Sequence, residues 1–282
     1  MRKISILGID GMLGSAVFDV FKKSKFDIIG INRSKLDAIS AEINDIRKVI
    51  DNSDYIINCI GIIKPYIDDN NSCEVERAIQ INALFPYKLS QCGCKVIQIA
   101  TDCVFDGKEG NYKETDKHNA LDVYGKTKSL GEVNSENFLN LRCSIIGLEK
   151  KSKKSLLEWF INQNRDAKVN GYMNHFWNGI TTYVFAKICM GIIENDLWFS
   201  GLQHIVPANI LSKADMLYLF SEVFSRRDIS IDKINANEGI NRTLGTNNEI
   251  RNKQLWEAAG YSRIPNIEEM ICEINNYKKE DY

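Results

Sequence analysis

The chain has 282 residues, of which 44% are hydrophobic and 26% charged, and its formal net charge is −1. This length suits one large domain, or a domain with a smaller lobe. The near-neutral charge argues against a nucleic-acid-binding protein, which normally carries a basic surplus. No apolar run reaches the roughly 20 residues that a bilayer span requires. We therefore expect a cytoplasmic protein with neither nucleic acid nor membrane as a partner.

The eight cysteines are scattered along the chain, several of them inside apolar runs, and none form paired CxxC knuckles. This distribution is typical of reduced, mostly buried thiols in a cytosolic protein. Cys92 and Cys94 flank a single glycine and are the one candidate metal or redox pair. No histidine or second cysteine pair accompanies them, so we predict no metal site.

The first half of the chain alternates short apolar runs with longer segments of helical periodicity. Strands separated by helices predict a doubly wound parallel sheet of the Rossmann type, and continuous apolar strands are typical of a sheet covered on both faces. The predicted strands are 3–7, 27–31, 55–59 and 95–100, and the predicted helices are 12–23, 45–50 and 74–89.

The second half is less regular. Ser212 and Asp215 resemble the ends of a capping box that opens a helix running to residue 224. Further helices are predicted at 156–164, 183–194 and 267–275. We expect residues 1–150 to form the sheet domain and residues 151–282 to form mainly a smaller C-terminal lobe, with some segments returning to the main sheet.

A glycine-rich turn follows the first predicted strand and opens the first helix, in the pattern GxxGxxG. Such a turn needs residues without a Cβ so that the backbone can approach a pyrophosphate, and the helix N-terminus offers free N–H groups to the phosphates. We therefore predict an NAD(P)-binding domain. The residues of this turn predicted to bind the cofactor are Gly8, Asp10, Gly11, Met12, Leu13 and Gly14.

The residues after the second strand indicate which of the two nicotinamide cofactors the chain binds. An acid there would bind the adenosine 2′-hydroxyl, whereas this chain has Asn32, Arg33 and Ser34. Arg33 and Ser34 suit a 2′-phosphate, so we predict NADPH, with NADH as the alternative. Asp45 and Ile46 lie where a carboxylate could meet the adenine amino group.

The ends of the third and fourth strands should also reach the cofactor. In open α/β sheets, ligands bind beyond the carboxyl ends of the strands. The third strand ends in Cys59, Ile60 and Gly61, and the fourth ends at Ala100. We predict that these four residues line the cofactor site.

Tyr124 and Lys128 form a YxxxK pattern, which on a helix puts both side chains on one face. A free phenol has a pKa near 10, too high for ready proton exchange at neutral pH. An ammonium about 4 Å away could lower it by about 3 units at most, making Tyr124 a usable acid or base. Thr101, at the end of the fourth strand, can donate a hydrogen bond to a carbonyl oxygen that gains negative charge.

Four segments together resemble a known family: Ala100–Gly107, Tyr124–Lys128, Leu141–Gly147 and Ile81–Pro86. They are similar to the extended short-chain dehydrogenase/reductases, in the dTDP-4-dehydrorhamnose reductase branch. The resemblance covers the first 150 residues well and the rest loosely. It implies a substrate-binding C-terminal lobe and an enzyme that reduces the 4-keto group of a nucleotide-activated deoxysugar for surface-polysaccharide biosynthesis.

The resemblance also implies roles for individual residues. Thr101, Tyr124 and Lys128 would form the catalytic triad, with Tyr124 protonating the oxygen and Lys128 also holding the nicotinamide ribose. The nucleotide sugar would be the partner, and family habit allows a homodimer. The predicted substrate contacts are Cys103, Val104, Phe105, His175, Trp177, Asn178 and Arg242.

Two alternatives stay open. Cys103 stands where the reductase branch usually has tyrosine, and GDP-fucose synthases use a cysteine there with a histidine for epimerisation. Cys103 with His175 would make the chain an epimerase-reductase of that kind, unless both side chains only fill space. The second alternative is a non-catalytic NADP-binding regulatory subunit, because the beta subunit of methionine adenosyltransferase also resembles this branch. The segment 64–71 is expected to form a loop over the site.

Overall fold

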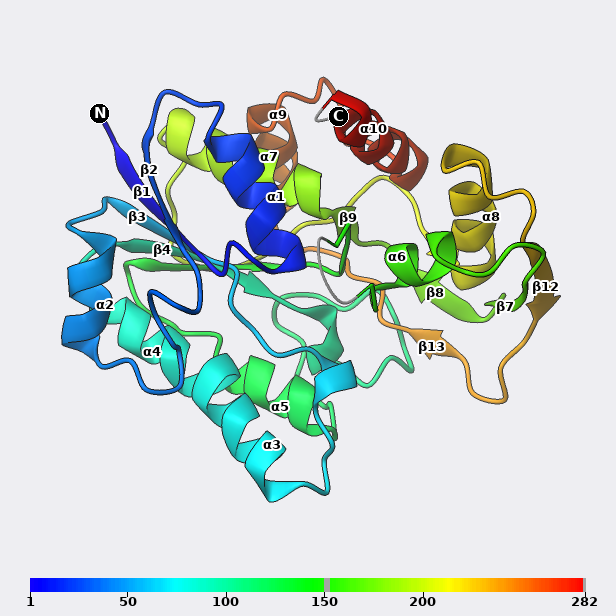
Figure 1. Ribbon diagram of the computed structural model, residues 1–282, viewed down its shortest axis with the longest axis horizontal. Helices are drawn as coiled ribbons and strands as arrows, with labels where there is room; N and C mark the ends of the chain where they lie inside the picture. The colour runs from blue at the N-terminus through cyan, green and yellow to red at the C-terminus, as the bar shows by residue number, and fades with distance from the viewer. Residues whose placement is uncertain (150–152, 281–282) are drawn as a thin grey trace.

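The computed structural model describes residues 1–149 and 153–280, and a six-stranded parallel sheet lies at its centre (Figure 1). The strand order β10-β5-β4-β3-β1-β2 and the helices between strands confirm the predicted doubly wound fold. Three of the four predicted strands have the expected bounds, and the third ends one residue early. The strands are β1 (Lys3–Leu7), β2 (Asp27–Ile31), β3 (Tyr55–Asn58), β4 (Lys95–Ala100), β5 (Phe138–Arg142) and β10 (Gly201–His204).

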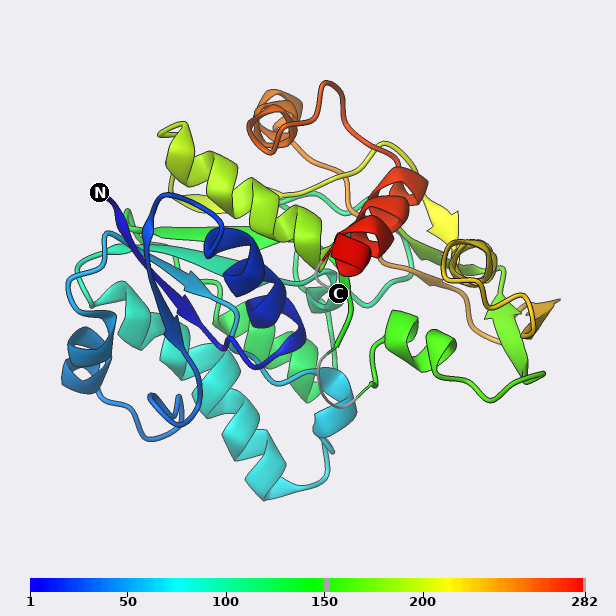
Figure 2. The ribbon, with the colours of Figure 1, turned by 45° about the horizontal axis from the view of Figure 1, so that its top comes forward.

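Helices cover both faces of this sheet (Figures 1 and 2). Helices α1 (Met12–Phe21) and α7 (Thr182–Glu194) lie on one face. Helices α2 (Ile43–Ile50), α4 (Phe85–Ser90) and α5 (Val123–Leu130) lie on the other. Successive strand residues point to opposite faces, so the apolar side chains of the strands contribute to two separate hydrophobic cores.

The predicted helix 74–89 is continuous in space but is interrupted by a wide turn. Helix α3 (Ser72–Ala78) passes through the π-helical segment η2 (Ile79–Leu84) into α4. Pro86 lacks the N–H that an α-helix would donate to the Asn82 carbonyl, which accounts for the widening. A Cβ on Gly131 would lie 1.9 Å from that carbonyl oxygen, so only glycine lets the end of α5 approach it.

The C-terminal lobe lies beyond the carboxyl ends of the sheet strands (Figure 1). Strand β10 belongs to the main sheet, so the chain returns to it after residue 150. The predicted boundary at 150–151 lies outside the described residues. The lobe's elements are β6 (Ile145–Ile146), α6 (Leu156–Ile161), β7 (Lys168–Tyr172), β8 (His175–Trp177), β9 (Ile180–Thr181), β11 (Leu211–Ser212), α8 (Lys213–Val223), β12 (Ser230–Ile234), β13 (Ile240–Asn241), α9 (Glu249–Ala258) and α10 (Ile267–Glu280).

Local sequence signals account for several helix boundaries. The Ser212 hydroxyl accepts a bond from the Asp215 N–H at 3.1 Å, which confirms the predicted cap of α8. Helix α6 ends at Ile161, three residues early, where the Asn162 side chain donates to the Glu158 carbonyl at 2.8 Å. Helix α10 continues five residues past its predicted end. In the part of the chain that the structure describes, every helix is too short or too polar to cross a bilayer.

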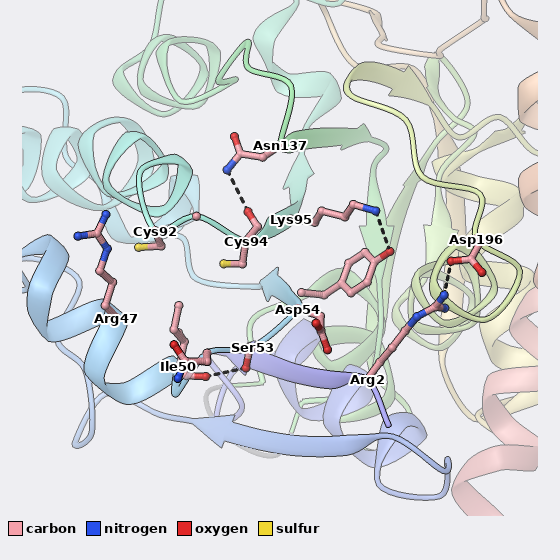
Figure 3. Close-up of a pocket in the computed structure, with 13 residues that line it drawn as sticks. Arg2, Arg47, Ile50, Ser53, Asp54, Cys92, Cys94, Lys95, Asn137 and Asp196 are labelled. Atoms are coloured by element: carbon pink, nitrogen blue, oxygen red, sulfur yellow. Dashed lines mark hydrogen bonds and ion pairs between the residues drawn. The ribbon is translucent and has the colours of Figure 1, made fainter.

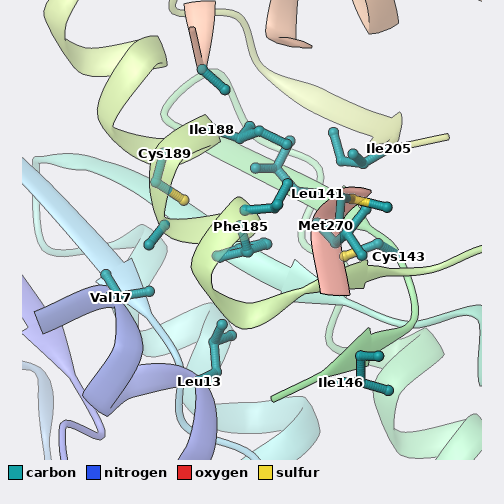
Figure 4. Close-up of a cluster of buried hydrophobic side chains, with 14 of the residues drawn as sticks. Leu13, Val17, Leu141, Cys143, Ile146, Phe185, Ile188, Cys189, Ile205 and Met270 are labelled. Carbon is teal, nitrogen blue, oxygen red and sulfur yellow. The ribbon is translucent and has the colours of Figure 1, made fainter. Parts of the chain in front are cut away.

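The main core holds α7 against α1 and the sheet (Figure 4). Phe185 of α7 is fully buried among side chains that include Leu13 and Val17 of α1. These contacts join α1, near the start of the chain, to α7, which in the sequence comes after the first elements of the C-terminal lobe. Helix α7 is therefore part of the sheet domain in three dimensions.

Truncating Phe185 to alanine should destabilise the chain by about 3–5 kcal/mol, because the substitution leaves a cavity in a close-packed core. Urea unfolding followed by circular dichroism measures the change. Ile250→Ala is the matched control, since Ile250 is 75% exposed and should change the free energy of unfolding by less than about 0.5 kcal/mol. Equal effects of the two substitutions would contradict the assigned core.

Candidate active site

The glycine turn has the backbone that a bound pyrophosphate requires. Gly8 has φ +82°, in the left-handed region that favours glycine. A Cβ on Gly14 would lie 2.0 Å from the Gly8 carbonyl oxygen, so helix α1 packs directly on the turn. Gly11 caps α1, and the first turn of that helix carries no acid. The turn therefore fits a dinucleotide, because backbone N–H groups and the helix dipole favour phosphate there.

The neighbours of this turn divide into exposed and buried groups. A Cβ on Gly8 would meet the Cys59 carbonyl carbon at 3.3 Å and the Ile60 side chain at 3.1 Å, so the end of β3 lies against the turn. Asp10 and Gly11 of the turn are exposed, as is Gly61 after the end of β3. The remaining predicted residues of the turn and strand ends are partly or fully buried: Met12, Leu13, Gly14, Cys59, Ile60 and Ala100. Leu13 packs in the main core (Figure 4), so only its backbone is available to a ligand.

Arg33 and Ser34 are exposed at the end of β2, as a 2′-phosphate contact requires. The Arg33 guanidinium donates to the Asp37 carboxylate at 3.2 Å, and the Ser34 hydroxyl donates to the Asn32 side-chain oxygen at 2.8 Å. Asp37 is an acid near the strand end that sequence reasoning missed. To bind the phosphate, Arg33 would have to break this ion pair, which contributes little stability because it is exposed.

In the structure Asp45 caps a helix and the Ile46 side chain packs in a core. The Asp45 carboxylate accepts from the Glu42 N–H at 3.0 Å in a capping box at the start of α2. Ile46 is fully buried in the second core, so its side chain cannot contact a ligand. The sequence spacing put both residues near the site, but helix capping and core packing occupy their side chains.

Thr101 and Tyr124 come together at the carboxyl end of β4. Thr101 directly follows the strand and is buried. Tyr124 lies in the first turn of α5. The Asp122 carboxylate caps this helix by accepting a hydrogen bond from the Gly125 N–H at 2.8 Å. Burial is the largest influence on the Tyr124 phenol and raises its pKa, as does Cys103, while a hydrogen bond with Thr101 lowers it. The phenol therefore stays protonated, which is the form that can donate a proton.

Lys128 lies one helical turn after Tyr124 and is almost wholly buried. Its amine donates to the Ile99 carbonyl oxygen of β4 at 2.9 Å. Burial lowers its pKa to about 8, against an opposing influence from Glu132. The pKa of Tyr124 is raised on balance, and not lowered as the sequence predicted, because burial of the phenol is the largest influence on it.

A buried carboxyl and a thiol complete this cluster. Asp102 is buried and accepts from the Thr101 hydroxyl at 3.2 Å and from the Cys103 thiol at 3.7 Å. Burial raises the pKa of the Cys103 thiol to about 12. The thiol is therefore neutral at physiological pH, whereas a base for epimerisation would need to be a thiolate.

Four of the predicted substrate residues belong to the packing of the lobe. Val104 and Phe105 are fully buried in a small core, where Phe105 stacks on Tyr112 with 4.2 Å between ring centroids. Trp177 is 5% exposed and packs in the main core. The Asn178 amide bonds the backbone of Leu244. The side chains of these four residues are buried and contact other parts of the protein, which does not support the predicted sugar contacts.

The other two predicted contacts, His175 and Arg242, have different surroundings. His175 lies 3.2 Å from the Glu238 carbonyl oxygen and against the Tyr172 ring, and within the described residues it has no recorded contact with Cys103. The Arg242 guanidinium donates to the Phe105 carbonyl at 2.9 Å and acts electrostatically on Asp102 and Cys103. Only Arg242 therefore belongs to the cluster around Thr101.

Sequence reasoning missed a buried network behind the site. Arg142, fully buried at the end of β5, forms an ion pair with Glu132 at 2.5 Å and hydrogen-bonds the rings of His204 and His118. Burial lowers the pKa of His204 to about 4, so that ring is neutral and can accept from the guanidinium. These residues lie far apart in the sequence, and no spacing pattern links them.

The loop 64–71 lies beside the start of α5. The Lys64 amine pairs with the Asp122 carboxylate at 2.9 Å, and the Asp69 carboxylate accepts from the Val123 N–H at 3.1 Å. Asp122 and Val123, which make these contacts, lie within two residues of Tyr124 in the sequence. The loop thus borders the candidate site, where the sequence had put it.

A cavity of about 830 Å³ lies at the opposite edge of the sheet (Figure 3). Arg2, Ser53 and Lys95 line it, at the amino ends of the strands. Its Arg2 pairs with Asp196 and its Lys95 lies 3.4 Å from the Tyr55 hydroxyl. Ligands of open α/β sheets bind at the carboxyl ends instead, so we do not assign this cavity to the cofactor.

The parallel sheet, the glycine turn and the helices on both faces define a Rossmann-type protein. A family model described as RmlD substrate binding domain matches residues 1–238. The chain belongs to that family, and the resemblance to the dTDP-4-dehydrorhamnose reductase branch is confirmed.

Individual relatives fall into two kinds. The methionine adenosyltransferase 2 subunit beta of Xenopus tropicalis is 26% identical over 250 residues, covering 79% of this chain and 72% of the relative. A dTDP-4-dehydrorhamnose reductase of Aggregatibacter actinomycetemcomitans is 29% identical over 147 residues, 47% of this chain and 46% of the relative. The solved structure of the Bacillus anthracis dTDP-4-dehydrorhamnose reductase in complex with NADP has a TM-score of 0.77 at 18% identity, covering 98% of this chain and 100% of that one.

Replacing Gly14 by alanine should destabilise the chain by about 1–3 kcal/mol, because the new Cβ would overlap the Gly8 carbonyl. Gly11→Ala is the matched control, since its nearest neighbour would lie at an ordinary 3.4 Å. Thermal unfolding of the two variants measures the difference. A Gly14→Ala protein as stable as the Gly11→Ala protein would contradict the close packing of α1 on the turn.

Lys128→Met should make the chain more stable at pH 7 by up to about 3 kcal/mol, because the folded-state pKa lies about two units below the ordinary value near 10.4. Below about pH 8 the amine is charged in both folded and unfolded chains, so the cost of burying the charge is fully present. Between there and the ordinary pKa the folded chain has lost a proton that the unfolded chain keeps, so the free energy of unfolding rises with pH.

Urea unfolding at a series of pH values from 7 to 10.5 measures this slope. The wild type should show the rise and Lys128→Met should lack it, while Lys126→Met, on the exposed side of the same helix, should keep it. A slope that persists unchanged in Lys128→Met would assign the titration to another group.

Proposed function

We propose that this chain is an NADPH-dependent reductase of the 4-keto group of a nucleotide-activated deoxysugar. The observation that carries the proposal is the cluster of a protonated phenol, a hydroxyl and a buried amine at the carboxyl end of β4. Membership in the family supports it, as does the dTDP-4-dehydrorhamnose reductase relative. The relatives do not identify the nucleotide or the sugar of this chain's substrate.

The residues divide the chemistry between them. The bound cofactor supplies a hydride to the carbonyl carbon of the sugar. Thr101 donates a hydrogen bond to the carbonyl oxygen as negative charge develops on it, and Tyr124 gives that oxygen its proton. Lys128 would hold the nicotinamide ribose, and its ammonium would favour the phenolate that the proton transfer leaves behind.

The cofactor preference rests on the end of β2. Arg33 and Ser34 are exposed there and can both bond a 2′-phosphate. The structural neighbour from Bacillus anthracis is in complex with NADP, which supports NADPH over NADH. The Gly8 turn would hold the pyrophosphate.

A regulatory subunit that binds NADP without turnover is the second candidate, and the methionine adenosyltransferase beta subunits among the relatives favour it. The retained Thr101, Tyr124 and Lys128 favour the reductase, since a binding protein does not need a proton donor. The two candidates make opposite predictions for turnover and the same prediction for cofactor binding.

NADPH oxidation with a panel of dTDP-, UDP-, GDP- and CDP-linked 4-keto sugars tests the proposal. The wild type should turn over at least one of them. Tyr124→Phe should lower kcat by about 10²–10⁴-fold, because the general acid is lost, with NADPH binding unchanged by fluorescence titration.

Tyr218→Phe is the control, since this tyrosine lies on α8 with its hydroxyl on the Ile231 carbonyl at 2.9 Å, and it should keep full activity. NADPH binding without turnover on the whole panel would favour the regulatory subunit. Unchanged turnover in Tyr124→Phe would refute the assigned acid.

A further inference from the structure

The ring of His118 joins the helix that carries Tyr124 and Lys128 to the buried network behind the site. Its Nδ1 lies 2.6 Å from the Ser129 hydroxyl oxygen of α5, and its Nε2 lies 2.6 Å from the Arg142 guanidinium. Ser129 directly follows Lys128, and Arg142 is fully buried at the end of β5. The imidazole is therefore a link between α5 and the central sheet.

The two partners of the ring determine where its proton lies. A guanidinium offers N–H donors and no acceptor, so the Arg142 group can only donate to Nε2. That nitrogen therefore carries a lone pair, and the proton of the neutral ring is on Nδ1, where it is donated to the Ser129 hydroxyl. The link in this form exists only while the His118 imidazole is neutral.

Protonation would break the bond to Arg142, because an imidazolium has an N–H at both nitrogens and repels the guanidinium. The Glu132 carboxylate lies 3.7 Å from Nε2 and could accept from the second N–H. It already pairs with Arg142 through both oxygens, at 3.0 and 2.5 Å. Two cations would thus compete for one carboxylate, and the ring would move away from the guanidinium.

The His118 ring can exchange protons with the solvent, since its side chain is 26% exposed. The Phe105 ring packs edge-on against it, with 5.6 Å between the ring centroids, and the charged groups that act on it are Glu132 and Arg142. Burial, the largest influence, lowers the pKa of His118; Glu132 opposes this and Arg142 adds to it. The ring is therefore neutral at pH 7 and becomes protonated only below the ordinary pKa near 6.5.

We propose that His118 is a positioning residue whose neutral ring ties α5 to Arg142, and that its protonation releases this tie and loosens the helix that carries Tyr124 and Lys128. The two residues that follow His118 donate their N–H groups to the Val104 carbonyl oxygen at 3.1 Å, so the same loop also supports the segment after Thr101. The inference rests on the proposed function only for its effect on turnover.

Amide hydrogen exchange of α5, measured by mass spectrometry at about pH 7.5 and about pH 5 and corrected for the intrinsic rates, tests the inference without a substrate. Exchange in the wild type should be about 5- to 10-fold faster at the lower pH, because a charge-assisted hydrogen bond is lost. His118→Gln keeps an acceptor for Arg142 but does not titrate, so its corrected exchange should be equal at both pH values. His175→Gln is the matched control, since it removes a histidine that lies on β8 of the lobe, and it should keep the wild-type acceleration.

Turnover should follow the same pattern once a substrate is in hand. The ratio of kcat between the two pH values should differ by about 5- to 10-fold between the wild type and His118→Gln, with equal kcat at the higher pH. Equal exchange of α5 at both pH values in the wild type, or the same acceleration in His118→Gln, would overturn the inference and leave the proposed function standing. An acceleration that His118→Gln abolishes, in a chain that turns over no ketosugar, would uphold the inference and overturn only the proposed function.

Discussion

The burial of one ammonium group constrains the candidate site more than any other interaction. Lys128 is held by the Ile99 carbonyl at 2.9 Å, and this bond fixes α5 against the end of β4. Because side chains one helical turn apart share a face, the same bond turns Tyr124 toward Thr101. The folded chain keeps a charge in a place where it costs free energy, as expected of a functional residue rather than a stabilising one.

The lobe is joined to the sheet through polar contacts as well as through the apolar core. The Arg242 guanidinium donates to the Phe105 carbonyl oxygen, and the His204 ring of β10 lies 2.7 Å from the Gly245 carbonyl oxygen of the lobe. Within the sheet domain, the buried Arg142 hydrogen-bonds His204 and pairs with Glu132. Glu132 in turn acts on Lys128 and opposes the lowering of its pKa. The lobe, the sheet and the amine of the site are therefore parts of one network, in which a buried polar group without its partner would be costly.

Sequence periodicity was sufficient to predict the sheet, because strands covered on both faces are continuous apolar runs. The glycine turn and the Tyr124–Lys128 pair were also predictable, since each depends on residues close together in the chain. The lobe was harder. Val104 and Asn178 have polar or loop-like surroundings in the sequence, yet tertiary packing buries both.

Transfer of a labelled hydride tests the central claim most directly. The protein would be incubated with NADPH carrying deuterium at the transferred position and with the 4-keto nucleotide sugar that it accepts, and the product would be read by mass spectrometry and NMR. The account predicts one deuterium at C4 of the sugar and, in a parallel reaction in heavy water, no solvent deuterium at C3 or C5. Retention of the label on a bound cofactor with no reduced sugar would contradict it.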